Sequence, residues 1–525
     1  MDSLSAIVPV SLHSLLPHPL PYLRPLPSTI PLTPLAAIVP PLLYYLAALF
    51  LAPVSFSPPS PLIKFLTASL RNILALTSLI QFIRLPLCYH VPFSVGLTYQ
   101  LALVGIYGAC RVNDAFFLGP YVLGYLPRRI RYHHAPRSHS STPGNGTPEP
   151  RRTPKRQEDN ESYFSLHFLS NPRPGEPITE TATTDNEALD GWTDRASWAL
   201  ELVLSMRGQG FVWTSTDVRH TKKTWRPTVG NRVHSILVHV LPILMASWAV
   251  IAYIYTYHLS PLPAFTFSSA SEASSRPRAF DSLPLIPHQV ALTMALGAFL
   301  MAAFSLGHSC FAIALSPFAP HPISFFPPLY TNRAWDITSV REFWAYGWHR
   351  LFSRLFLVYG VWPGEWLAGK AFAFIGPRNG PMDARAKDIG KIVGGFLSSA
   401  FVHSFAAWCV SGGNVRDASG EFYFFAENGV AVLVEEGVKI CVIGLRRRRP
   451  RQNIENKDGK DIAHAGQHVT ADAKKVKEDF RKWYDPWIGR VWFITVVLFT
   501  GRNFARGWVG SGLVREMAEI GTGGG

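Results

Sequence analysis

Long apolar runs, separated by polar and proline-rich segments, dominate the hydrophobic pattern of this chain. A helix needs about 20 residues to cross the roughly 30 Å hydrocarbon core of a bilayer. The clearest runs of about this length cover residues 35–54, 95–121, 235–259, 288–315, 392–410 and 422–445. The pattern therefore predicts membrane-spanning helices.

Two further apolar runs are weaker candidates. Residues 487–500 span a bilayer only if flanking residues such as Trp483 and Phe504 join them, and residues 62–87 are interrupted by polar side chains such as Arg71. With these two runs included, we predict an all-α, polytopic integral-membrane helix bundle with about eight transmembrane helices. The composition agrees, because only 16% of the residues are charged, against roughly 25% in ordinary soluble domains.

Positive charge is concentrated in two loops beside the apolar runs. Residues 127–234 begin with several arginines, and residues 446–486 begin with the run from Arg446 to Arg449. Loops rich in Lys and Arg remain on the cytosolic side of a membrane, so we expect both loops to be cytosolic. The formal net charge of +15 is then a signal of membrane topology, and we expect no nucleic-acid partner.

These features divide the chain into six parts. We expect a proline-rich surface arm, the N-terminal transmembrane helices, a partly disordered cytosolic loop, a membrane core with the candidate catalytic residues, a basic cytosolic loop, and a last transmembrane helix with a tail. In that order the parts cover residues 1–34, 35–126, 127–234, 235–445, 446–486 and 487–525. The disorder is expected because residues 138–156 contain almost no apolar side chains to bury.

One segment without proline, residues 341–355, has an amphipathic pattern. Trp344, Trp348 and Leu355 recur at helical spacing, while Arg350 and Arg354 fall on another face. This spacing predicts an amphipathic helix at the cytosolic interface. A simple interfacial anchor is the plain alternative, since Trp and Arg are common at that depth.

A single histidine, His403, lies within the apolar run 392–410. An ionisable group there is unfavourable and usually faces a cavity or a partner, so His403 is a candidate functional residue. Gly395, Ser399 and Ala407 share its helical ridge, and small residues allow either close helix packing or an open chamber. A buried structural histidine remains an alternative, and His239 and His308 in other apolar runs are rivals that spacing alone does not exclude.

The cysteines give no sign of a metal centre. The chain has five of them, scattered in or beside the apolar runs without paired spacing. We therefore expect neither a disulfide framework nor a bound metal.

Three motifs resemble those of the wax synthase-like branch of the membrane-bound O-acyltransferase superfamily, which includes fungal members that acylate natural products. Residues 206–213 (MRGQGFVW) are similar to its Arg-Gly-x-Gly element, and residues 339–349 (SVREFWAYGWH) to its Ser-x-Arg-[Asp/Glu]-Phe-Trp-x-x-x-Trp-His element. Residues 396–403 are similar to its apolar helix with a late histidine. The order and spacing agree from about residue 206 to residue 408, whereas residues 345–347 (AYG) are less basic than the branch pattern.

The resemblance implies an O-acyltransferase that moves an acyl group, expected to be acetyl, from acyl-CoA to the hydroxyl of a lipophilic acceptor such as a terpenoid. Acyl-CoA is then a co-substrate, with no tightly bound cofactor, and the lipid bilayer of the endoplasmic reticulum is the expected location. His403 is expected to act as the general base, with His349 beside the donor as a second catalytic residue. The residues expected to bind acyl-CoA are Trp344, Trp348, Arg341, Arg350 and Arg354.

Two alternatives remain open from the sequence. Within the enzyme class, the chain can be a wax ester synthase that uses a long-chain alcohol. Outside it, a non-catalytic transporter or receptor also has polar groups inside the membrane. An acyltransferase needs the Trp-His segment beside the chamber that holds His403, whereas a transporter more often has broken spans and paired repeats.

Overall fold

The fold is known from a computed structural model. It describes residues 20–52, 60–124, 126–127, 130–132, 180–182, 191–206, 211, 229–260, 280–315, 329–330, 337–348, 351–373, 381–455 and 482–519. Within these residues nearly all regular structure is helical, as the sequence predicts. Most of the loop 127–234, including its predicted disorder, and both His349 and Arg350 lie outside the described residues.

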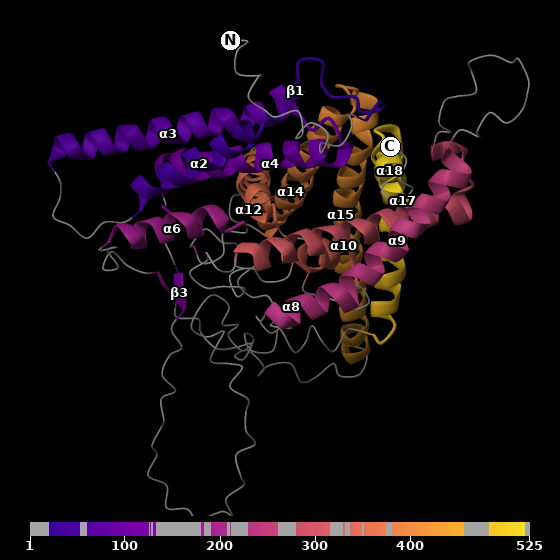
Figure 1. Ribbon diagram of the computed structural model, residues 1–525. Helices are drawn as coiled ribbons and strands as arrows, with labels where there is room; N and C mark the ends of the chain where they lie inside the picture. The colour runs from indigo at the N-terminus through magenta and orange to yellow at the C-terminus, as the bar shows by residue number, and fades with distance from the viewer. Residues whose placement is uncertain are drawn as a thin grey trace, which may run out of the picture.

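Long helices in the N-terminal part pack side by side (Figure 1). Three of them start after a hydroxyl side chain: Thr33, Ser60 and Ser94 each accept a hydrogen bond from the backbone N–H three residues further on. Such caps satisfy one of the free donors at a helix start. The helices are α2 (Pro34–Leu51), α3 (Pro61–Cys88), α4 (Val95–Asn113) and its π-helical continuation η2 (Asp114–Leu123).

The middle of the chain supplies two more long helical runs, Val229–Leu259 and Leu285–Leu315. They pack against each other, while a short helix packs on α2 and buries Trp198. The segments are α6 (Trp192–Leu204), α8 (Val229–Ser235), η3 (Ile236–Val240), α9 (Leu241–Ile254), η4 (Tyr255–Leu259), η6 (Phe280–Ser282), η7 (Leu285–Gln289) and α10 (Val290–Leu315).

The predicted amphipathic helix over residues 341–355 is not continuous. Its first part ends at Trp348, where the backbone becomes extended (φ −100°, ψ 161°) and the amide N–H bonds to the carbonyl of Phe343 at 2.8 Å. Gly347 precedes this break, and a Cβ there would lie 2.5 Å from the Ile337 side chain. The prediction of one uninterrupted helix is therefore wrong. The observed segments are α11 (Val340–Glu342), η10 (Phe343–Gly347), α12 (Ser353–Phe356), η11 (Leu357–Val361) and α13 (Trp362–Ala373).

Glycines bring the η11–α13 run against α14 (Pro381–Val410). A Cβ on Gly360 or Gly364 would meet the carbonyl oxygen of Gly394 or Gly390, respectively. Small residues four apart allow two backbones to approach closely in this way. At Gly390 and Gly394 the small residues of α14 therefore allow close helix packing and not an open chamber.

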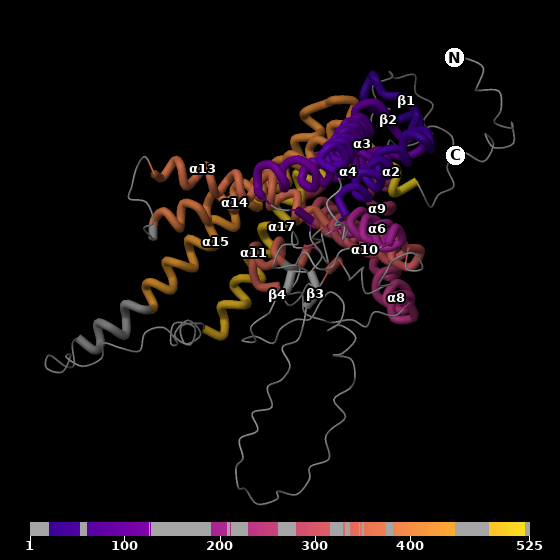
Figure 2. The backbone as a smooth tube through the Cα atoms, turned by 90° about the vertical axis from the view of Figure 1, so that its left-hand side faces the viewer, coloured from indigo at the N-terminus to yellow at the C-terminus, as the bar shows by residue number. Residues whose placement is uncertain are grey.

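The C-terminal helices complete the bundle. α14 packs against α15 and α15 against α17; α15 and α17 run upright in Figure 1, and Figure 2 shows them extending away from the N-terminal helices. The remaining helices are α15 (Val415–Glu455), α17 (Asp485–Gly510) and α18 (Leu513–Glu519).

The described part contains two short sheets and an isolated parallel bridge between Arg24 and Ser411. β1 (Ile30–Pro31) pairs in parallel with β2 (Tyr89–His90), and β3 (Ile130–Tyr132) pairs antiparallel with β4 (Glu180–Ala182). Neither alters the all-α class.

Seven of the eight predicted spans lie within helices, and residues 35–51 of the remaining one, predicted over residues 35–54, lie in α2. Six of these helices are long and apolar enough to cross a membrane, namely Pro34–Leu51, Pro61–Cys88, Val95–Leu123, Val229–Leu259, Leu285–Leu315 and Met382–Val410. The other two predicted spans fall in α15 and α17, which carry more polar side chains. In α15 several of these are buried inside the protein, including Glu421 and Asn428, both 0% exposed. The architecture is that of an integral-membrane helix bundle.

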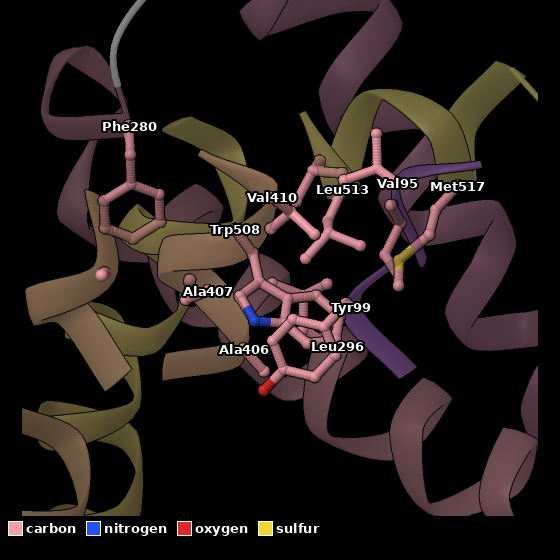
Figure 3. Close-up of a cluster of buried hydrophobic side chains, with 14 of the residues drawn as sticks. Val95, Tyr99, Phe280, Leu296, Ala406, Ala407, Val410, Trp508, Leu513 and Met517 are labelled. Atoms are coloured by element: carbon pink, nitrogen blue, oxygen red, sulfur yellow. The ribbon is translucent and has the colours of Figure 1, made fainter. Parts of the chain in front are cut away.

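The largest apolar core lies where α4, α9, α10, α14, α17 and α18 meet. Figure 3 shows Tyr99 of α4 beside Trp508 of α17 in this core, with ring centroids 5.8 Å apart. Ala406 and Ala407 of α14 approach from one side. The polar groups of Tyr99 and Trp508 need partners in this apolar surrounding, and those partners form the candidate site.

Candidate active site

His403 is held in a polar network inside the bundle. The residue is 8% exposed, and its Nδ1 lies 3.1 Å from the hydroxyl oxygen of Tyr99 on α4. His403 lies on α14 seven residues before its end at Val410. Within the described residues, no hydrogen-bond partner faces its other ring nitrogen, Nε2. The imidazole is therefore oriented through one nitrogen and leaves the other available.

Glu421 anchors this network. Its side chain is fully buried, and it accepts a hydrogen bond from the Tyr99 hydroxyl at 2.7 Å and another from Trp508 Nε1 at 2.7 Å. The distance from Oε2 of Glu421 to Nδ1 of His403 is 3.8 Å, which is too long for a direct hydrogen bond. Tyr99 thus bridges the carboxylate and the imidazole.

Trp344 is fixed by a second buried network. Its indole Nε1 donates to Oδ1 of Asn428 at 3.0 Å. The amide nitrogen of Asn428 donates in turn to Thr500 Oγ1 at 2.9 Å and to the carbonyl of Phe424 at 2.7 Å. Because both the amide oxygen and the amide nitrogen of Asn428 have partners, this buried side chain is well satisfied and defines the position of Trp344.

Phe425 joins the two networks. Its ring stacks on the imidazole of His403, with centroids 4.5 Å apart and planes inclined by 23°. The same ring lies 5.4 Å from the ring of Trp344. The two motifs that the sequence singles out, about sixty residues apart, therefore meet across one aromatic side chain.

The start of the Trp-containing segment is fastened to α15. The backbone N–H of Val340 donates to Glu435 at 2.8 Å, and Arg341 pairs with Glu436 at 3.0 Å. Lys439 pairs with both glutamates, at 2.6 Å and 3.2 Å, as its helical spacing predicts. The Arg341 side chain is 61% exposed, so it remains accessible to a soluble ligand.

Trp348 lies beyond the break but stays in the aromatic cluster. Its ring centroid is 5.9 Å from that of Trp344, 5.6 Å from Phe343 and 6.2 Å from Tyr330. Burial raises the pKa of the Tyr330 phenol, so this group is neutral at physiological pH. Trp344 and Trp348 thus form one continuous aromatic surface leading toward Phe425.

Arg354 is directed into the bundle. It is 5% exposed and forms a two-point ion pair with Asp114, with Nε–Oδ2 at 2.8 Å and Nη2–Oδ1 at 3.1 Å. Its guanidinium also lies 5.1 Å from the ring centroid of Trp362. This position favours a role in joining η2 to α12 over contact with CoA phosphates, which we expected from the sequence.

The rival histidines differ from His403 in their surroundings. His239 is exposed on η3, and His308 is only partly buried on α10. His403 is buried and contacts a buried carboxylate through Tyr99.

Sequence reasoning missed Tyr99, Glu421 and Phe425. Tyr99 and His403 are 304 positions apart, and Tyr99 and Glu421 are 322 positions apart. Glu421 stands at the edge of a predicted span, where a carboxylate at a helix end is unremarkable by pattern alone. In the structure this helix begins earlier, at Val415, so Glu421 lies inside the helix and not at its end.

Comparison with known proteins gives one family match. Residues 326–426 match the model of the membrane bound O-acyl transferase family. The matched stretch contains Trp344, Trp348, His403, Glu421 and Phe425. The match supports assignment to the membrane-bound O-acyltransferase superfamily and, in general terms, O-acyltransferase activity at a membrane. No curated protein and no solved structure matches the chain.

Proposed function

We propose that this protein transfers an acyl group from acyl-CoA to the hydroxyl of a lipophilic acceptor, with His403 as the general base. The observation that carries the proposal is the meeting of Trp344 and His403 across Phe425, inside the stretch that matches the family. A transport function would not require these two motifs to meet at one imidazole. The resemblance to the wax synthase-like branch, with its fungal natural-product members, favours acetyl as the acyl group and a terpenoid as the acceptor.

The chemistry needs only groups that the site contains. A neutral imidazole takes the hydroxyl proton as the acceptor oxygen attacks the thioester carbonyl. Because the acyl group passes directly to the acceptor, no Ser or Cys nucleophile is required. A hydroxyl that arrives from the lipid phase matches a base buried among transmembrane helices.

We place the acyl donor, acyl-CoA, at the cytosolic side of the segment that contains Trp344, Trp348 and His349. CoA is water-soluble, and Arg341 is an exposed cation on that segment, suited to charge-assisted contact with phosphates. Trp344 and Trp348 offer an apolar surface for the pantetheine arm and acyl chain. His349 and Arg350 are assigned to the same mouth from the sequence motif alone. The endoplasmic reticulum is the proposed membrane.

Product analysis tests the proposal directly. Membranes containing the protein are supplied with acetyl-CoA or palmitoyl-CoA, together with a terpenoid alcohol or a long-chain alcohol, and products are measured by mass spectrometry. We expect an acetylated terpenoid that is absent from membranes carrying His403→Ala. A palmitoyl ester of the long-chain alcohol would instead identify a wax ester synthase, and no ester with any pair would contradict the proposal.

A further inference from the structure

We propose that Tyr99 and Glu421 are positioning residues that hold His403 in the tautomer needed for catalysis. The inference rests on the proposed function and deepens it, because it assigns the group that orients the base. Its starting point is the direction of the hydrogen bonds around Tyr99.

A phenol has one proton to donate. The Tyr99 hydroxyl donates to Oε2 of Glu421 at 2.7 Å, so its oxygen presents a lone pair to Nδ1 of His403 at 3.1 Å. A neutral imidazole carries its proton on one nitrogen and a lone pair on the other. Nδ1 therefore carries the proton, and Nε2 carries the lone pair that accepts a proton from the acceptor.

The anchor of this arrangement is rigid. Oε1 of Glu421 accepts from Trp508 Nε1 at 2.7 Å while Oε2 accepts from Tyr99. A carboxylate with a donor on each oxygen has little freedom to rotate. The network joins α4, α14, α15 and α17, so four helices fix the ring of His403.

The same network compensates charge during the reaction. The acceptor hydroxyl gives its proton to Nε2 while its oxygen forms a bond to the thioester carbonyl carbon. The carbon–sulfur bond then breaks, and the departing sulfur takes the proton from Nε2, which yields an ester and the CoA thiol. Nδ1 keeps its proton throughout, and the transient imidazolium faces a phenol oxygen backed by Glu421.

A purely structural network is the competing explanation, and kinetics separates the two. Tyr99→Phe keeps the ring beside Trp508 and removes only the hydroxyl. We expect kcat to fall about 10- to 100-fold, the size of effect seen when a metal-bound histidine loses the partner that orients its ring. The KM for acyl-CoA should stay within about twofold, because the lost interaction acts on the transition state and not on donor binding.

A double variant gives the decisive readout. If Tyr99 acts through His403, adding Tyr99→Phe to His403→Ala produces no further loss of kcat, since residues that act as a unit are not additive. A further loss of similar size would mean that Tyr99 supports the fold generally, which overturns the inference. Glu421→Gln keeps the shape of the side chain and changes its hydrogen bonding to the Tyr99 hydroxyl, so kcat should fall as in Tyr99→Phe. This variant serves if Tyr99→Phe is recovered poorly.

Tyr359→Phe is the matched control. Its hydroxyl accepts from Asn113 Nδ2 at 2.8 Å and donates to the Cys110 carbonyl at 3.1 Å, without contacting His403. This variant should keep wild-type kcat. Normal activity in His403→Ala would remove the proposed function's base, whereas an inactive His403→Ala beside a fully active Tyr99→Phe would overturn the positioning role alone.

Discussion

The ring of Phe425 lies flat on the imidazole of His403, with centroids 4.5 Å apart. An imidazolium over an aromatic face is stabilised more than a neutral imidazole, by about 0.5–2 kcal/mol. Because the charge develops only as His403 takes the proton, this contact favours the transition state. Phe425 is therefore expected to affect turnover and not only packing.

Phe425→Leu tests this contact. It keeps an apolar side chain but removes the aromatic face, so kcat should fall about 2- to 30-fold while the KM for acyl-CoA changes little. Steady-state kinetics in membranes measures both constants. Phe422→Leu, an exposed position on the same helix, is the control and should match the wild type. An unchanged kcat in Phe425→Leu would show that the stacking is only structural.

Arg354→Met should lower stability and not donor affinity. The substitution leaves the carboxylate of Asp114 buried without its two-point partner, which destabilises a protein by about 3–5 kcal/mol. Thermal unfolding in detergent measures the effect. Arg341→Met breaks an exposed pair and should change stability by about 0–1 kcal/mol. A stable Arg354→Met protein with a raised KM for acyl-CoA would instead support the phosphate contact expected from the sequence.

Gly394→Ala should separate the η11–α13 run from α14. A Cβ at Gly394 would meet the carbonyl oxygen of Gly360, and overpacking of this kind destabilises a protein by at least about 1–3 kcal/mol. Gly437→Ala is the control, because a Cβ at Gly437 has open space around it. Thermal unfolding of the two variants compares them. Equal stabilities would mean that the two helices do not depend on this close approach.

The sequence predicted the elements well and their contacts poorly. Length and hydrophobicity located the apolar spans, because a bilayer imposes a minimum helix length. Only part of the site could be predicted from the sequence. His403 was identified as an ionisable group in an apolar run, whereas its partner Tyr99 looked like an ordinary aromatic residue of another span. Arg354 had the pattern of a surface cation, but its burial depends on Asp114, 240 positions away. Contacts between distant helices leave no local pattern.

The membrane topology gives a prediction on residues outside the described structure. Asn160, within the sequence Asn160-Glu161-Ser162, should carry no glycan, because the arginine-rich loop 127–234 is expected to face the cytosol. Mass spectrometry of the purified native protein checks this. A glycosylation site introduced into residues 260–287 is the positive control, because one predicted span, residues 235–259, separates them from the cytosolic loop 127–234 and so places them in the lumen. A glycan on Asn160 would reverse the predicted topology and, with it, the side from which acyl-CoA enters.

The most direct test of the account is the turnover of His403→Ala with acetyl-CoA and an accepted alcohol. Loss of a positioned general base should lower kcat by about two to four orders of magnitude, while the protein still inserts into membranes and binds acyl-CoA. His239→Ala and His308→Ala, measured beside it, should lose far less. Near-normal turnover in a correctly folded His403→Ala protein would contradict the central claim, and an inactive but folded His308→Ala protein would place the base on α10.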